Sequence, residues 1–227
     1  MKNDFILKLI SIPVAVIFVA VSAWAQVKPT SADDYHGTIN YAVSQTNSAY
    51  PVIFKAEINE FENGKSVRKS TEMVENESEL HSRSTKIVAR GGKTTTIYEI
   101  LVGEGNGFCK EDNGAWRRSQ FVCPEPGVSE LRLMRPRQPE SVKYSVEDKK
   151  IGGKNIKVYH KYAVFSADNE KEAKKTFKEE TATVDSDGYF ISVDKIEGSL
   201  GPVVVTQTLK ESWIVKAKFE KIVEPIK

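Results

Sequence analysis

Short turns that contain glycine recur along this chain, and each lies between segments in which apolar and polar residues alternate. The turns are centred on Asn63-Gly64, Gly91-Gly92, Asn113-Gly114, Gly152-Gly153 and Asp187-Gly188. Gly and Asn accept the positive φ angles of tight hairpin turns, and a period of two is typical of half-buried strands. Connections this short join antiparallel neighbours, because parallel neighbours need a long crossover. The pattern therefore predicts one large antiparallel sheet of about nine or ten strands rather than βαβ units.

A sheet of this size is expected to curl. Each strand is rotated against the next by about 20°, so a sheet of many strands bends around toward itself. We therefore expect a mainly β (α+β) fold. In it, a single curled antiparallel sheet forms a half-open barrel with an N-terminal helix and short lid helices.

The N-terminal helix is predicted to begin near residue 31. Ser31 and Asp34 have the spacing of a capping box, in which the serine oxygen accepts a hydrogen bond from the backbone amide three residues on. One apolar stripe then follows at helical spacing, formed by Tyr35, Ile39, Ala42 and Val43. Gly37 lowers the helix propensity, so packing must hold this helix in place.

Two later segments are predicted as the lid helices. Residues Ser129 to Arg135 combine large apolar and basic side chains between prolines. Residues Asp168 to Glu180 are dense in charge, and the Glu170 and Lys174 pair supports an exposed helix by a few tenths of a kcal/mol.

The first 25 residues predict export. Lys2 and Lys8 precede an apolar run, and Ser22-Ala23-Trp24-Ala25 places small residues at the two positions that a signal peptidase reads. The prediction is a signal peptide at 1–25 and a single half-barrel domain at 26–227, in the periplasm or secreted. An uncleaved anchor is the alternative, although the run is at the short end for a span of about 20 residues. No cysteine follows for lipid attachment, so we expect a soluble product without a transmembrane span after cleavage.

The charge of the chain argues against a nucleic-acid partner. The formal net charge is +2, and removing Lys2, Lys8 and Asp4 with the signal segment leaves +1. A protein whose main task is to neutralise phosphates usually carries a clear basic excess or a dense basic stripe.

Cys109 and Cys123 are the only cysteines of the chain. An even number in an exported protein predicts a disulfide, which would stabilise the fold by about 3 kcal/mol in the chain-entropy model. A hairpin centred on Asn113-Gly114 would place Cys109 opposite Arg118 rather than Cys123, so the following segment would have to bend back. Two free thiols are the alternative.

Residue patterns for catalysis or metal binding are absent from the sequence. His36, His81 and His160 stand alone, without H-E-x-x-H, H-x-H or G-x-S-x-G patterns. A triad assembled from distant positions stays open. We expect no catalytic residues, no metal, no cofactor and no enzymatic activity.

The apolar residues of the strands predict a ligand site. A curled sheet too wide to fill its own interior leaves a hydrophobic cavity. The residues predicted to line it are Phe54, Tyr98, Ile100, Trp116, Phe190, Trp213 and Val215. The alternative is an ordinary core covered by the N-terminal helix.

Three short phrases accompany the signal peptide and the opening helix. They are Asp112-Asn113-Gly114-Ala115-Trp116, Asp185-Ser186-Asp187-Gly188-Tyr189-Phe190 and Phe219-Glu220-Lys221-Ile222-Val223-Glu224-Pro225-Ile226. In this order they resemble the bacterial periplasmic lipoprotein-carrier superfamily, which includes the outer-membrane lipoprotein-localisation factors. The resemblance covers most of the mature chain. It implies a half-barrel of antiparallel strands with a helical lid over an apolar cavity that holds acyl chains.

The first functional hypothesis is an exported, non-catalytic carrier that binds a lipid, an acylated protein or another hydrophobic ligand in the concave face of the half-barrel. The second is an interaction or sensing module for an envelope protein partner, built on the same scaffold with a filled core. An exported hydrolase is the third.

Overall fold

The computed structural model describes residues 27–103, 106–119, 138–166, 175–200 and 204–225. Three predictions lie outside these residues and stay predictions. They are the signal peptide at 1–25, the helix at Ser129 to Arg135, and the disulfide partner Cys123.

The described residues form one helix and twelve strands. The helix α1 spans Ala32–Asn47. The first half of the sheet comprises β1 (Lys28–Pro29), β2 (Val52–Glu62), β3 (Lys65–Ser78), β4 (His81–Arg90), β5 (Lys93–Val102) and β6 (Gly107–Glu111). The second half comprises β7 (Arg117–Ser119), β8 (Ser141–Ile151), β9 (Lys154–Phe165), β10 (Thr176–Asp185), β11 (Phe190–Ser199) and β12 (Val204–Val215).

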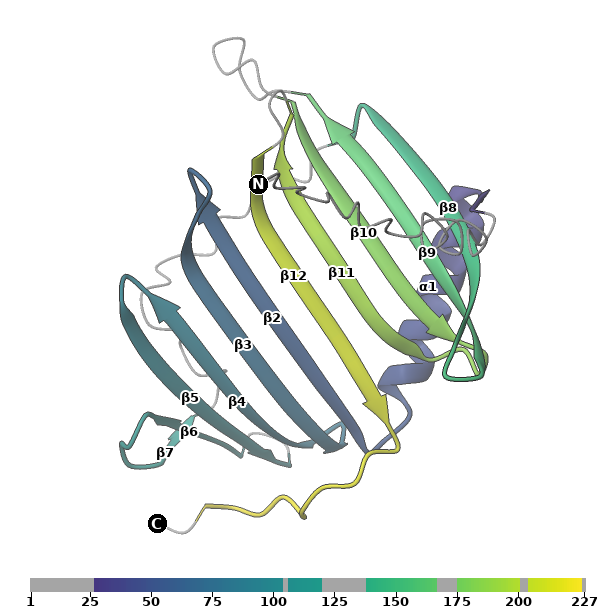
Figure 1. Ribbon diagram of the computed structural model, residues 1–227. Helices are drawn as coiled ribbons and strands as arrows, with labels where there is room; N and C mark the ends of the chain where they lie inside the picture. The colour runs from purple at the N-terminus through teal and green to yellow at the C-terminus, as the bar shows by residue number, and fades with distance from the viewer. Residues whose placement is uncertain (1–26, 104–105, 120–137, 167–174, 201–203, 226–227) are drawn as a thin grey trace, which may run out of the picture.

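All the strands belong to one antiparallel sheet in the order β1-β8-β9-β10-β11-β12-β2-β3-β4-β5-β6-β7. The short strands β1 and β7 lie at the two edges, so the sheet is not closed (Figure 1). The predicted mainly β fold, with one antiparallel sheet and an N-terminal helix, is confirmed. The described residues contain more strands than the nine or ten expected, because β3 lacks a clear alternation of apolar and polar residues and β10 begins within the predicted helix.

Most of the glycine turns form as predicted. Asn63 and Gly64 have φ angles of 50° and 76°, and the Gly91-Gly92 and Gly152-Gly153 pairs also have positive φ. The turn after β6 is longer than expected, because Asp112 already leaves the strand with a φ of 45°. Cys109 therefore pairs with Arg117 rather than with Arg118.

The helix begins at the predicted cap, where the Ser31 side chain accepts a hydrogen bond from the Asp34 amide. Its buried residues are Tyr35, Ala42 and Thr46, with Ile39 packed beside them. Val43 is 40 % exposed, which corrects its place in the predicted stripe. The contact line of α1 runs through positions 35, 39, 42 and 46, so Val43 lies to one side of it.

The predicted helix at Asp168 to Glu180 is wrong over its described part, because β10 begins at Thr176. This strand pairs with β9 on one side and with β11 on the other. Tertiary partners replace the expected helical pairs: Lys178 contacts Glu197 on the neighbouring strand, and Glu180 accepts a hydrogen bond from Tyr35 on α1. Tertiary pairing here overrides local helix propensity.

The end of the chain also differs from the sequence pattern. Apolar and polar residues still alternate from Val215 to Phe219, but β12 ends at Val215. The chain leaves the sheet at Lys216, which has a φ of 53°. The following segment continues without regular structure, and its Ile222 is 3 % exposed where it packs against Ile100 and Phe108.

The pairing register divides the side chains between two faces, because residues directly opposite each other in antiparallel strands point the same way. The core against α1 contains Tyr159 on β9, Ala182 on β10 and Phe190 on β11. We call this side of the sheet the helix face and the other side the opposite face. Trp213, which packs on the same core, pairs with Phe54, so the helix face extends to β2.

Candidate functional site

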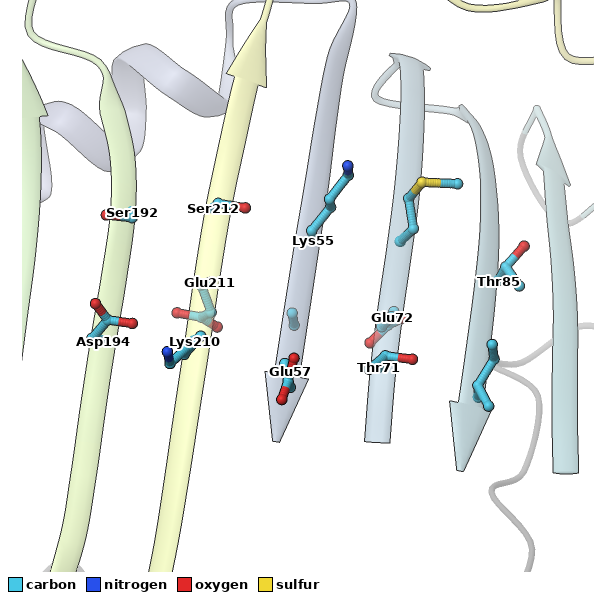
Figure 2. Close-up of a pocket in the computed structure, with 13 residues that line it drawn as sticks. Lys55, Glu57, Thr71, Glu72, Thr85, Ser192, Asp194, Lys210, Glu211 and Ser212 are labelled. Carbon is cyan, nitrogen blue, oxygen red and sulfur yellow. The ribbon is translucent and has the colours of Figure 1, made fainter. Parts of the chain in front are cut away.

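A hollow of about 650 Å³ lies on the opposite face, across β11, β12, β2, β3 and β4 (Figure 2). The register shows which of its lining residues point into it: Lys55, Glu57, Thr71, Met73, Thr85, Ile87, Ser192, Asp194, Lys210 and Ser212. This volume is within the range of small-ligand pockets, about 300–1,000 Å³.

The first row of side chains across the hollow follows one line of cross-strand pairs. Ser192 lies opposite Ser212, and Ser212 lies opposite Lys55. Lys55 in turn lies opposite Met73, which lies opposite Thr85. The row therefore carries hydroxyl and ammonium groups on β11, β12 and β2, the thioether of Met73 on β3, and the hydroxyl and methyl groups of Thr85 on β4.

The second row carries alternating charges. Asp194 lies opposite Lys210, and Lys210 lies opposite Glu57. Asn59 Nδ2 donates a hydrogen bond to Glu57 Oε1 over 3.1 Å, and Lys69 Nζ lies 3.0 Å from the same oxygen. These two contacts, followed by the charge of Lys210, hold the pKa of Glu57 below its usual value. The carboxylate of Glu57 is therefore ionised and already partnered at neutral pH.

The apolar part of the hollow is accessible to solvent. Met73 is 38 % exposed and Ile87 is 41 % exposed. Ile214, which pairs with Ile53 in the row next to that of Lys55, is 50 % exposed. Aliphatic side chains of this size are usually buried, so these three form an exposed apolar group on the opposite face.

Four of the predicted ligand residues lie on the helix face instead. Phe54, Phe190, Trp213 and Val215 share this face, with the Trp213 ring 5.3 Å from the rings of both Phe54 and Phe190. Phe190 is 4 % exposed and belongs to the core beneath α1. Phe190 and Trp213 thus pack in the core with residues of α1, and Phe54 contacts the Trp213 ring.

The other three predicted residues lie on the opposite face, beyond the hollow. Ile100 is buried against the C-terminal segment, and Trp116 packs on the same cluster. Lys110 Nζ lies 4.6 Å from the centre of the Tyr98 ring and 5.4 Å from the centre of the Trp116 ring. The seven residues are thus divided between two clusters, and none of them lines the hollow.

Comparison with known protein families and with curated proteins finds no match for this chain. Among the described residues, no helix is long and apolar enough to cross a membrane. The same residues contain no group of three or more His, Cys, Asp or Glu side chains that could hold a metal ion.

One histidine has partners that resemble a catalytic triad. His160 Nδ1 lies 3.3 Å from Thr181 Oγ1, and His160 Nε2 lies 3.2 Å from Glu147 Oε1. Burial raises the pKa of Glu147, but contacts with Lys149 and His160 outweigh it and lower the pKa overall. β9 pairs with both β8 and β10 at this position, so its backbone amides take part in the sheet.

The lining of the hollow was missed because its residues look like the solvent side of ordinary strands. Lys55 and Glu57 alternate with Phe54, Ala56 and Ile58, so the pattern predicts that Lys55 and Glu57 lie on the solvent-exposed face of the strand. Only the register brings them beside Met73 and Ile87 of the neighbouring strands. The adjacent apolar pairs Met73-Val74 and Ile87-Val88, which place an apolar residue on each face of a strand, are a signal that the sequence does contain.

Proposed function

We propose that this protein is exported and binds an amphiphilic ligand in the hollow, as a non-catalytic carrier in the periplasm or outside the cell. The ligand class is a lipid or the acyl chain of an acylated protein. The observation that carries the proposal is the hollow itself, with solvent-accessible Met73 and Ile87 beside polar and charged groups.

A ligand with an apolar chain would gain affinity by covering these side chains. Each methylene group that leaves water contributes about 0.8 kcal/mol, and micromolar binding corresponds to about 8 kcal/mol, so a chain of about ten or more carbons is needed. The lysine stems of the hollow add apolar contact area while their ammonium groups stay in water. Binding therefore needs no covalent chemistry, which agrees with the absence of a nucleophile motif in the sequence.

A second candidate is the envelope interaction or sensing module. The aromatic core of the helix face supports it, because Phe190 and Trp213 pack in one cluster with Tyr35 and Ala42 of α1. In that case Met73, Ile87 and Ile214 would contact a partner protein instead of a lipid.

The experiment is a fluorescence titration with N-phenyl-1-naphthylamine, a neutral apolar probe. We expect saturable binding by the unmodified protein. Ile87→Glu should lower the affinity about tenfold or more, because an apolar probe bound there would remove the new carboxylate from water. The matched control is Ile151→Glu. Ile151 is 61 % exposed in the β8–β9 hairpin, outside the hollow.

Equal affinities of the two variants would show that the probe binds elsewhere. Absence of saturable binding to the unmodified protein would contradict the carrier and favour the interaction module. Circular dichroism of both variants, with unchanged strand content, ensures that a lost signal reports the site rather than unfolding.

A further inference from the structure

The hollow has two chemically different ends. On β11, β12 and β2 it presents the hydroxyl groups of Ser192 and Ser212 and the ammonium group of Lys55. On β3 and β4 it presents the side chains of Met73 and Ile87, with the hydroxyl groups of Thr71 and Thr85 beside them. Figure 2 shows Ser192, Ser212 and Lys55 on three adjacent strands, with Thr71 and Thr85 on the two strands beyond Lys55.

The charges of the second row balance one another. Lys69 contacts Glu57, and Lys210 lies directly opposite Asp194. Glu211 points to the helix face, where its carboxylate lies 3.8 Å from Lys195 Nζ. These pairs leave the acidic groups around the hollow with positive partners.

Lys55 is the positive charge left over. It forms no ion pair within the part of the chain that the structure describes, and Ser212 and Met73 are its cross-strand neighbours. Glu57, the nearest acidic residue on its own strand and face, is two positions away, about 7 Å, and is held by Lys69 and Asn59. An ammonium group at the rim of an apolar wall can therefore pair with a negative group brought by a ligand.

We propose that the polar end binds the carboxylate head group of the ligand, with Lys55 as the charged partner and Ser192 and Ser212 as hydrogen-bond donors. This inference rests on the proposed function and adds the orientation of the ligand. The carboxylate lies over β12 and β2, and the acyl chain runs across β3 and β4 toward Ile87. A charge-assisted contact to Lys55 would make binding selective for the anion over the corresponding alcohol.

The test compares two ligands that share a chain but differ in charge. Dodecanoate and dodecanol each displace N-phenyl-1-naphthylamine from the unmodified protein and from Lys55→Met, which keeps an apolar stem and removes the charge. We expect Lys55→Met to weaken dodecanoate binding about tenfold and to leave dodecanol binding within a factor of about two. Added salt should weaken only the binding of dodecanoate to the unmodified protein.

Lys93→Met is the matched control, because Lys93 is an exposed lysine at the start of β5 and outside the hollow. It should change neither affinity. An equal loss for both ligands in Lys55→Met, or no loss for dodecanoate, overturns the head-group assignment while the proposed function stands. A protein that binds neither the probe nor either ligand overturns both proposals.

Discussion

Tyr35 joins the helix to the sheet through a single polar atom. Its side chain is 1 % exposed, and its hydroxyl group donates a 2.7 Å hydrogen bond to Glu180 Oε1 on β10. Its ring also contacts the rings of Tyr144 and Tyr159, with centres 4.9 and 6.2 Å away. Burial, followed by the bond to Glu180, raises the pKa of Tyr35 well above its usual value, so the hydroxyl stays a donor at any working pH.

Replacing Tyr35 by Phe should lower the free energy of unfolding by about 1–2 kcal/mol, because a hydrogen bond to a charged acceptor is lost in a buried setting. Urea denaturation at pH 7 measures the change. Tyr41→Phe is the control, since Tyr41 is 59 % exposed on the same helix and should have no effect. Equal midpoints for the two variants would mean that the Tyr35 hydroxyl contributes nothing to docking of the helix.

At the scale of elements, the sequence was enough to predict turns and helix caps but not which strands pair with one another. Asn63-Gly64 and the Ser31 cap are local features, since the chemistry of two or three neighbouring residues decides them. Thr176 to Glu180 resembles a charged helix in sequence, and only its position between β9 and β11 makes it a strand. Thr46 was missed for the same reason, because its hydroxyl accepts a hydrogen bond from the distant Phe190 amide.

Two glycines, one in α1 and one in β11, allow a test of the space around the backbone in each element. Gly37 lies inside α1 with open space around its missing side chain, so Gly37→Ala should stabilise the protein by about 0.5–1 kcal/mol through helix propensity. At Gly198, beside a bulge in β11, a Cβ atom would meet the Val204 carbonyl oxygen and lie 2.7 Å from Phe177 Cε1. Gly198→Ala should therefore destabilise the protein.

Thermal or urea denaturation of the two glycine variants should show shifts of opposite sign. Shifts of the same sign would contradict either the helical environment of Gly37 or the close packing at Gly198.

At the scale of the whole molecule, the sequence predicted the single sheet but not the use of its two faces. Phe54 and Trp213 belong to the helix face, whereas Tyr98 and Ile100 point the opposite way. Alternation within one strand cannot show this, because a shift of one residue in pairing exchanges the faces. The hollow is lined by residues from five strands, so no single segment of the sequence predicts it.

Export is the prediction that concerns the molecule as a whole. Expression of the full chain in a bacterium with a general secretion system should yield a protein that begins at Gln26, because a signal peptidase would cleave after Ala25. Intact mass measurement of the purified product reads this directly. A mass that includes residues 1–25 would contradict cleavage and favour the uncleaved anchor.

The central claim is that an amphiphile occupies the hollow, and Met73 offers the most direct measurement of it. The chain contains three methionines, and Met73 lies on the apolar wall of the hollow. In protein labelled at the methionine methyl groups, the Met73 resonance is assigned by its loss in Met73→Leu. We predict that this resonance shifts in a saturable way as dodecanoate is added. An unchanged Met73 resonance at ligand concentrations that displace N-phenyl-1-naphthylamine would contradict the account.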